Sequence, residues 1–334
     1  MTGAPVLEVR NLSAHIATAR GTVHAVDDVS LTIDGGEASG IVGESGSGKS
    51  VLAKSIMGLL PPNSARSGEL TFRGRDLLSL SKKDQLEIWG NQIAMVFQDP
   101  GRSLNPVVRV ERQLTEGMRR HLGLGRSEAR ARALTLLQEV GVPDPERRLR
   151  NYPHEMSGGM RQRVMIAIAL ACEPELLIAD EPTTALDVTI QRQILDLLRR
   201  VQRERNMSMI LISHDLAVVA GRTDRVSVMY AGRLAEVGAT HDVFDAPRHR
   251  YTQALLAATP TIDHPRHSPL RVIPGALPDP TALPTGCRFA PRCDHAHDDC
   301  RTTGPELADV GTGHTAACLH PIGETAATTV TSGR

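Results

Sequence analysis

Eight residues near the N-terminus have the spacing of a phosphate-binding loop. They fit the pattern G-x-x-x-x-G-K-[ST] and are Gly43, Glu44, Ser45, Gly46, Ser47, Gly48, Lys49 and Ser50. Glycines let the backbone turn its N–H groups toward phosphate oxygens, and the start of the expected following helix adds the positive end of its dipole. In such loops the lysine reaches the β- and γ-phosphates, and the hydroxyl of the last residue binds Mg²⁺. The loop therefore predicts a nucleotide and magnesium site.

A second candidate is an apolar run that ends in two carboxylates. Residues 176–179 are Leu-Leu-Ile-Ala, followed by Asp180 and Glu181. An aspartate at a strand tip can hold the Mg²⁺ shell near Ser50, and the next carboxylate can polarise an attacking water. A strand followed by an acidic turn is common, so the pair indicates hydrolysis only because a phosphate loop precedes it.

A second glycine-containing element, Ser157-Gly158-Gly159, precedes an apolar stretch that favours a helix over residues 159–171. Backbone N–H groups at a helix start can bind phosphate. The alternative is an ordinary helix cap made by the serine. An enzyme with one self-contained site has little use for two phosphate-binding elements. We therefore expect two copies of the chain, or two related chains, to close around shared nucleotides.

Four of the five cysteines are grouped near the C-terminus, at Cys287, Cys293, Cys300 and Cys318. Four thiolates can hold Zn²⁺ or a [4Fe–4S] cluster, although the C-x2-C pairs typical of structural zinc are missing. Free thiols or a disulfide remain alternatives. The neighbouring histidines could be zinc ligands but are expected to be solvent-facing loop residues; they are His295, His297, His314 and His320.

The elements that must position these groups follow an alternating order. Strands are expected at 6–9, 29–33, 39–42, 93–97, 176–179 and 209–212, and helices at 49–59, 112–138, 159–171 and 190–203. Strands that alternate with helices indicate an α/β fold, with a mostly parallel sheet covered by helices on both faces. After about residue 238 proline, histidine and threonine increase, and we expect a separate, loop-rich appendage there with a disordered last stretch.

Composition excludes several classes of function. The 38 basic and 38 acidic side chains cancel, and aromatic residues make up only 2%, which argues against nucleic-acid binding. The longest apolar run, residues 164–171, is too short for a membrane span, and the N-terminus does not resemble a signal peptide. We expect a soluble cytoplasmic protein whose membrane role, if any, depends on partners.

These motifs, in this order, resemble an ATP-binding cassette (ABC) ATPase of a transporter. The resemblance implies a P-loop fold over residues 5–240, with a helical signature subdomain at about 99–165, and it implies ATP with Mg²⁺ as ligands. It also implies that Gln98 senses Mg²⁺ and water, that Ala185-Leu186-Asp187 is the D-loop, and that His214 contacts the γ-phosphate. Two such subunits would close head to tail, so that Ser157 and Gly159 of one contact the ATP of the other. In place of the family's usual adenine-stacking aromatic stands Ile16, which predicts weaker discrimination between ATP and GTP.

The cysteine group and residues 247–256 resemble the C-terminal region of oligopeptide/dipeptide importer ATPases, and this likeness covers roughly residues 5–320. It implies a [4Fe–4S] cluster rather than zinc, with a structural role, in a region spanning 241–325 and followed by a disordered tail at 326–334. The implied partners are a second ATPase subunit, identical or paralogous, two membrane permease subunits and an extracytoplasmic solute-binding protein. The chain would then lie at the cytoplasmic face of the membrane. Nickel or another small solute, a soluble ABC ATPase and a non-catalytic cassette remain alternatives.

Overall fold

A computed structural model describes residues 4–184, 186–259 and 272–323. Its centre is an eight-stranded sheet with the order β11-β12-β10-β9-β3-β8-β7-β6. The five strands from β9 to β6 run parallel and consist of β3 (Ala38–Val42), β6 (Ile93–Val96), β7 (Leu176–Asp180), β8 (Ser208–Ser213) and β9 (Arg225–Tyr230). Nearly all of their residues are buried, which explains why they appear in the sequence as short continuous apolar runs.

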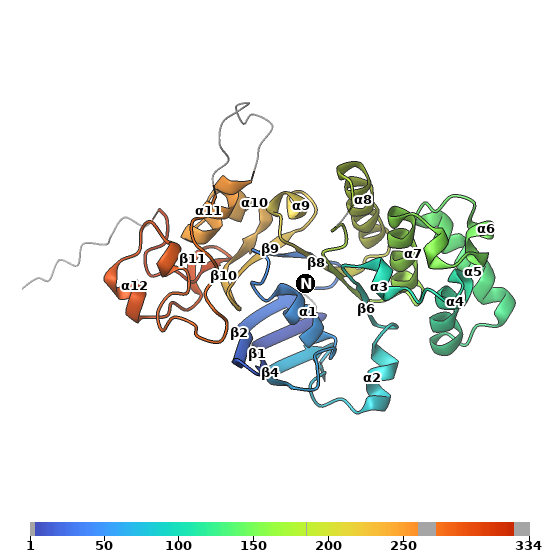
Figure 1. Ribbon diagram of the computed structural model, residues 1–334, viewed down its shortest axis with the longest axis horizontal. Helices are drawn as coiled ribbons and strands as arrows, with labels where there is room; N and C mark the ends of the chain where they lie inside the picture. Colours follow the sequence, from blue (N-terminus) through green and yellow to red (C-terminus); the bar gives the residue numbers. More distant parts are fainter. Residues whose placement is uncertain (1–3, 185, 260–271, 324–334) are drawn as a thin grey trace, which may run out of the picture.

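A second, antiparallel sheet packs beside the first and has the order β2-β1-β4-β5 (Figure 1). Its strands are β1 (Leu7–Thr18), β2 (Gly21–Ile33), β4 (Ser64–Phe72) and β5 (Arg75–Asp76). The expected short strands at 6–9 and 29–33 were therefore too short, and β4 was not predicted. Register shifts interrupt β1 and β2, and Asn11 and Asp28 have positive φ angles there. These irregularities break the period-two alternation that reveals a long strand.

Helices cover the parallel strands and form a helical part at one end of the molecule. Those near the site are α1 (Lys49–Ile56), α7 (Gly158–Leu170), α8 (Val188–Glu204) and α9 (Leu216–Val219). The end of the molecule contains α3 (Pro100–Ser103), α4 (Val110–His121), α5 (Arg126–Glu139) and α6 (Pro145–Arg150), while α2 (Lys82–Ile88) lies apart (Figure 1). The single helical stretch expected at 112–138 is wrong, because Gly123 at φ 67° separates α4 from α5.

The C-terminal residues, for which we expected a separate, loop-rich appendage, are joined to the main sheet. They contain α10 (Thr240–Asp245), α11 (Arg250–Ala258), the short helix η2 (Ala290–Arg292), α12 (Asp298–Thr302), β11 (Ala308–Gly311) and β12 (His314–Ala316). Strand β12 pairs antiparallel with β10 (Arg233–Ala239), so these residues extend the main sheet. The expected disordered tail at 326–334 lies outside the described residues.

A buried carboxylate joins the C-terminal residues to β10. Glu236 is fully buried and accepts hydrogen bonds from the backbone N–H groups of Arg248, at 2.6 Å, and of His249, at 2.9 Å. His314 Nε2 lies 2.7 Å from the same carboxylate. His314 is thus buried, contrary to the expectation of a solvent-facing residue, whereas the other three expected loop histidines, His295, His297 and His320, are exposed.

Two apolar clusters fill the described part of the molecule. One lies between the two sheets, and the other joins the parallel strands to the helical part and reaches Tyr251 and Phe289 near the C-terminus. The helical part and the C-terminal region are therefore packed on the sheet by burial of apolar side chains. None of the described helices combines the length and apolar character that crossing a bilayer requires.

Candidate functional site

The predicted site residues follow the carboxyl ends of neighbouring parallel strands. Gly43–Ser50 follow β3, Gln98 follows β6, Glu181 follows β7, and His214 follows β8. Because carboxyl ends of parallel strands meet at one edge of a sheet, residues distant in sequence lie together there. The structure brings these four elements to one site.

The glycines of the loop are required by close contacts. A Cβ atom at Gly43 would lie 2.1 Å from the Met229 carbonyl oxygen, and one at Gly48 would lie 2.2 Å from that of Ala25. Within the loop, the buried Lys49 Nζ donates to the carbonyl oxygens of Gly43 at 2.7 Å and Glu44 at 2.8 Å. Burial lowers the pKa of Lys49, while the nearby carboxylates oppose that shift. A ligand phosphate would add negative charge beside this ammonium, as is typical of the lysine in a phosphate loop.

Two oxygen ligands suited to a magnesium ion lie side by side beneath the loop. Ser50 Oγ donates to Asp180 Oδ1 at 2.8 Å, and Asp180 is 3% exposed. Burial raises the pKa of Asp180, against the hydrogen bond from Ser50. Hydroxyl and carboxylate oxygens are the donors that Mg²⁺ prefers, together with phosphate oxygens. The donor set therefore fits the predicted ion.

Three polar side chains lie close to the same oxygen of the Glu181 carboxylate. Glu181 Oε2 accepts hydrogen bonds from Gln98 Nε2 at 3.0 Å and Thr184 Oγ1 at 2.9 Å, and His214 Nδ1 lies 3.3 Å away. Glu181 itself adopts a left-handed backbone conformation at φ 45°. Its three neighbours hold the carboxylate where it can act as a base. Thr184 was missed in the sequence, although it lies only three residues after Glu181.

The Ser157 element and Asp187 both begin helices. Ser157 Oγ accepts from the Met160 N–H at 3.3 Å at the start of α7, and Asp187 accepts from the Ile190 N–H at 2.9 Å at the start of α8. Ser157 is exposed, and none of the residues 157–159 lines the cavity at the phosphate loop. Of the expected D-loop, Ala185 lies outside the described residues.

Glu44 differs from the other loop residues, because it faces the C-terminal region. Its N–H donates to the Tyr251 hydroxyl at 2.9 Å, and Arg292 Nη1 and Nη2 contact its two carboxylate oxygens at 3.0 and 3.1 Å. The Glu44 N–H, which the sequence suggested as a phosphate donor, is thus directed to the Tyr251 hydroxyl in this structure. Sequence reasoning missed Tyr251 and Arg292, and no short motif contains them.

Comparisons with known proteins agree with this geometry. Residues 26–184 match the family model described as ABC transporter, and residues 235–300 match the one described as oligopeptide/dipeptide transporter, C-terminal region. The dipeptide transport ATP-binding protein DppD of Escherichia coli K12 is 48% identical over 318 residues, 95% of this chain and 97% of the relative. The oligopeptide transport ATP-binding protein OppD of Salmonella typhimurium is 49% identical over 319 residues, 96% of this chain and 95% of the relative. This chain belongs to the ABC transporter ATPase family.

Solved ABC cassettes share the fold. The dimeric ATP-binding cassette MJ0796, in a post-hydrolysis state with ADP and phosphate, has a TM-score of 0.63 and 28% identity. The match covers 98% of that cassette but only 70% of this chain. The cassette cbiO1 of Clostridium perfringens has a TM-score of 0.61 and 32% identity, covering 72% of this chain and 91% of that one. The predicted P-loop ABC fold is confirmed, and the ABC ATPase carries additional residues beyond the cassette.

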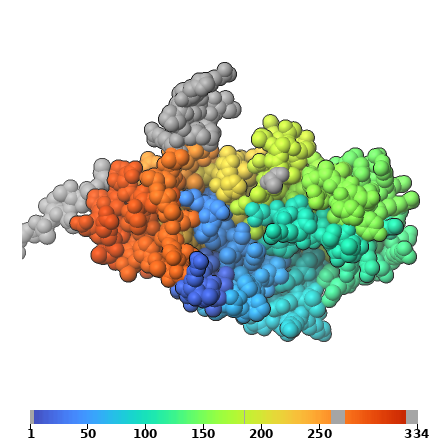
Figure 2. Space-filling view, in the orientation of Figure 1, coloured from blue at the N-terminus to red at the C-terminus, as the bar shows by residue number. Residues whose placement is uncertain are grey.

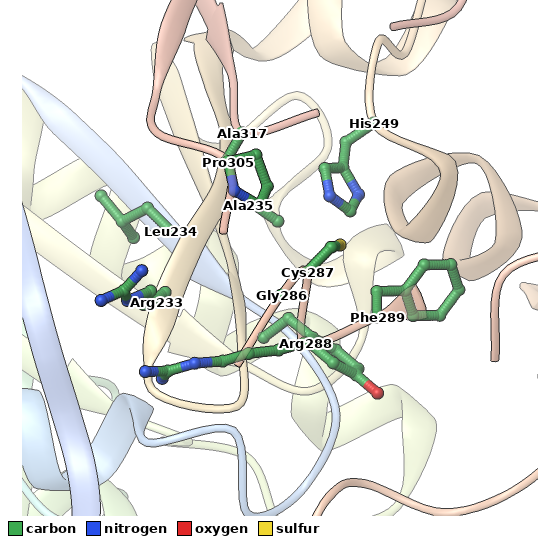
Figure 3. Close-up of a pocket in the computed structure, with 11 residues that line it drawn as sticks. Arg233, Leu234, Ala235, His249, Gly286, Cys287, Arg288, Phe289, Pro305 and Ala317 are labelled. Atoms are coloured by element: carbon green, nitrogen blue, oxygen red, sulfur yellow. The ribbon is translucent and has the colours of Figure 1, made fainter. Parts of the chain in front are cut away.

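The additional residues of this ABC ATPase bring the four cysteines into one neighbourhood. The Cys287 N–H donates to the Cys300 carbonyl oxygen at 2.8 Å. Burial raises the pKa of Cys318, and charges on Cys287, Cys293 and Cys300 would raise it further. All four are free thiols. The sulfur of Cys287 borders a cavity of about 40 Å³ that His249 and Phe289 also line (Figure 3).

Proposed function

We propose that this ABC ATPase is the ATP-hydrolysing subunit of an importer that moves dipeptides or oligopeptides across the cytoplasmic membrane of a bacterium. The observation that carries the proposal is that one chain combines the phosphate loop and the carboxylates Asp180 and Glu181 with a C-terminal region that matches the oligopeptide/dipeptide transporter model. Relatives named for dipeptide and oligopeptide transport align over nearly the whole chain, including that region. Nickel or another small solute is the second candidate within the same machine.

The site residues would divide the work of hydrolysis among them. Lys49 would bind the β- and γ-phosphates, and Ser50 and Asp180 would hold the Mg²⁺ with help from Gln98. The magnesium ion, when bound, would neutralise charge that develops on the phosphate oxygens. Glu181 would accept a hydrogen bond from the attacking water and orient it. His214, whose Nδ1 lies 3.3 Å from the Glu181 carboxylate, would contact the γ-phosphate.

The active unit would be a pair of ATPase subunits. The Ser157 element is exposed at a helix start and lies outside the cavity of its own phosphate loop. It is therefore free to contact the γ-phosphate held by the other subunit, where helix N–H groups favour negative charge. Asp187 would lie at the same subunit contact. The partner ATPase is either an identical chain or a paralogue.

Two membrane permease subunits and an extracytoplasmic solute-binding protein would complete the machine, and the ATPase would be held at the membrane through the permeases. We place their contact on the segment after Gln98, where Val107 is 79% exposed. An apolar side chain so exposed is a candidate contact for a partner. Val107→Asp should then prevent co-purification with the permeases, and Val272→Asp, at a valine 81% exposed elsewhere, should not. If the Val107→Asp protein still co-purified with the permeases, Val107 would not be part of the contact.

The solute is tested in the reconstituted transporter. Di- and oligopeptides, delivered with the solute-binding protein, should stimulate ATP hydrolysis by the wild-type complex. Nickel ions under the same conditions should not. Stimulation by nickel and not by peptide would replace the peptide assignment with the second candidate.

The four cysteines would hold a [4Fe–4S] cluster. Four free thiols are grouped, and burial raises the pKa values of Cys287, Cys293 and Cys318, while hydrogen bonds from backbone N–H groups to these sulfurs oppose that shift. Such N–H contacts are typical of cluster ligands. Four thiolates on one zinc ion would lie about 3.8 Å apart. In the described residues the one group of three potential ligands within 4.8 Å is Asp299, Cys300 and His320, which contains a single cysteine.

The metal content of the purified protein distinguishes a [4Fe–4S] cluster from a zinc ion. Protein purified without oxygen should contain about four iron atoms per chain and absorb near 400 nm. Cys287→Ser should lose both iron and absorbance, whereas Cys172→Ser, at a buried cysteine outside the group, should keep them. One zinc per chain without iron would overturn the cluster.

A further inference from the structure

The cavity at the phosphate loop has a wall that comes from the C-terminal region. The cavity has a volume of about 290 Å³. It is lined by Ser45, Gly46, Gly48, Lys49 and Ser50 of the phosphate loop and by Ile16, Val23, His24 and Ala25 of β1 and β2. Leu277, Pro278, Pro280 and Leu283 of the C-terminal region line it as well. Figure 2 shows the C-terminal residues lying directly against the N-terminal sheet.

This wall is held in place before any ligand arrives. The His24 N–H of β2 donates to the Pro280 carbonyl oxygen at 3.0 Å. Pro280 lies within a tight turn, in which the Asp279 carboxylate accepts hydrogen bonds from the Thr281 N–H at 2.8 Å and from the Thr281 hydroxyl at 2.7 Å. The prolines fix their own φ angles. A wall that is already ordered costs little conformational entropy when a ligand binds.

The wall also reaches the phosphate loop itself. A Cβ atom at Gly46 would lie 3.6 Å from Leu277 Cδ1, which is ordinary van der Waals contact. A ligand whose phosphates occupy the loop would therefore lie close to Leu277. Leu277 and Leu283 line the same cavity as Ile16 and Val23.

We propose that Leu277, Pro278, Pro280 and Leu283, together with Ile16 and Val23, form the nucleoside-binding wall of the ATP site. Apolar groups that line a cavity bind the ring of a base by excluding water from its surface. Ile16 offers no aromatic face for the base. The C-terminal segment supplies the missing apolar surface from the other end of the chain. The additional region of this ABC ATPase thus takes part in nucleotide binding.

The dissociation constants of two ligands test the role of this wall. The test rests on the ATP site proposed above. Inorganic tripolyphosphate occupies the phosphate loop but has no base, whereas ATP has both parts. Full-length Leu277→Ala, in a Glu181→Gln background that blocks hydrolysis, should bind ATP about three- to tenfold more weakly, because the base loses apolar contact. Its dissociation constant for tripolyphosphate should change less than twofold, which also shows an intact loop. Val272→Ala, at an exposed valine of the same region outside the cavity, is the matched control and should change neither constant.

Two results would contradict the proposal that these residues bind the nucleoside. Equal weakening of ATP and tripolyphosphate would mean that Leu277 only supports the phosphate loop, and unchanged binding of both would mean that the base lies elsewhere. Failure of the wild-type chain to bind tripolyphosphate or ATP would instead reject the ATP site itself. A second variant reports contact directly. Leu277→Trp should show fluorescence that ATP changes and tripolyphosphate does not, after subtraction of the signal from Trp89; an equal response to both ligands contradicts the wall.

Discussion

The guanidinium of Arg292 and the carboxylate of Glu44 form an ion pair between residues 248 positions apart in the sequence, with Nη1–Oε1 at 3.0 Å. Arg292 is the residue before Cys293, and Glu44 is the second residue of the phosphate loop. The Arg292 side chain is 4% exposed and that of Glu44 is 28% exposed. The pair therefore fixes the phosphate loop to the cysteine-containing region.

Arg292→Met should destabilise the protein, because it leaves the Glu44 carboxylate partly buried without its cation. We expect a loss of about 1–3 kcal/mol in the free energy of unfolding, discounted for the partial exposure of Glu44. Urea unfolding at neutral pH measures it. The matched control is the double variant Glu44→Gln with Arg292→Met, which should recover part of the loss. An Arg292→Met protein as stable as the wild type would show that the pair contributes nothing.

Glu181→Gln should bind ATP with nearly unchanged affinity and hydrolyse it about 10²–10⁴-fold more slowly, because the amide cannot accept a proton from the water. Gln98 and Thr184 would still contact the side-chain carbonyl oxygen, so the site should keep its shape. Nucleotide binding and phosphate release are measured on the same preparation. Glu204→Gln, at the end of α8 and remote from these contacts, is the control. Near wild-type turnover in Glu181→Gln would remove Glu181 as the base.

Ser157→Asp separates a helix cap from a contact with the partner's nucleotide. Aspartate caps helices as well as serine does, so the stability should stay within about 0.5 kcal/mol of the wild type. A carboxylate facing the γ-phosphate of the other subunit should lower ATP hydrolysis by the assembled transporter at least about tenfold. Ser157→Thr keeps both the cap and the hydroxyl and should remain active. Full activity of Ser157→Asp would leave Ser157 with only a capping role.

His249 should make the stability depend on pH. Its ring is buried, accepts from the Tyr251 N–H at 3.0 Å, and has a pKa lowered to about 4 by desolvation, against a hydrogen bond with the Ala317 backbone. The unfolded chain takes up this proton near pH 6.5, whereas the folded one takes it up only near pH 4. The stabilisation is therefore complete above pH 6.5 and is lost as the pH falls toward 4, by on the order of 3 kcal/mol.

His249→Asn is the variant that isolates this effect, because asparagine can still cap α11. Urea unfolding at pH 7.0, 5.5 and 4.5 should show a smaller loss of stability in His249→Asn than in the wild type. Parallel pH profiles for the two proteins would contradict the assignment to His249, since all other groups are shared.

The hydrolytic site could be predicted because its information is local. The phosphate loop follows one short apolar run, and Asp180 and Glu181 lie at the end of another; such runs form the buried parallel strands whose carboxyl ends meet at the site. The apolar runs in the sequence therefore correspond to the strands that position these residues. The likeness to known ABC ATPases added Gln98 and His214, which the structure places 3.0 Å and 3.3 Å from the Glu181 carboxylate.

The contacts of the C-terminal region could not be predicted in the same way. Tyr251 and Arg292 reach Glu44 across 207 and 248 residues of sequence, and no local pattern encodes a contact between residues so far apart. Low periodicity suggested a separate, loop-rich region, yet β12 and the buried Glu236 join it to the main sheet. Short strands and irregular turns leave no hydrophobic period in the sequence.

Uptake of a labelled di- or oligopeptide by cells that lack this chain tests the central claim most directly. Deletion should abolish uptake, the wild-type chain should restore it, and Glu181→Gln, present in equal amount and assembled with the permeases, should not. Uptake that persists without the chain, or that Glu181→Gln restores in full, would contradict the assignment of this protein as the ATPase that drives peptide import.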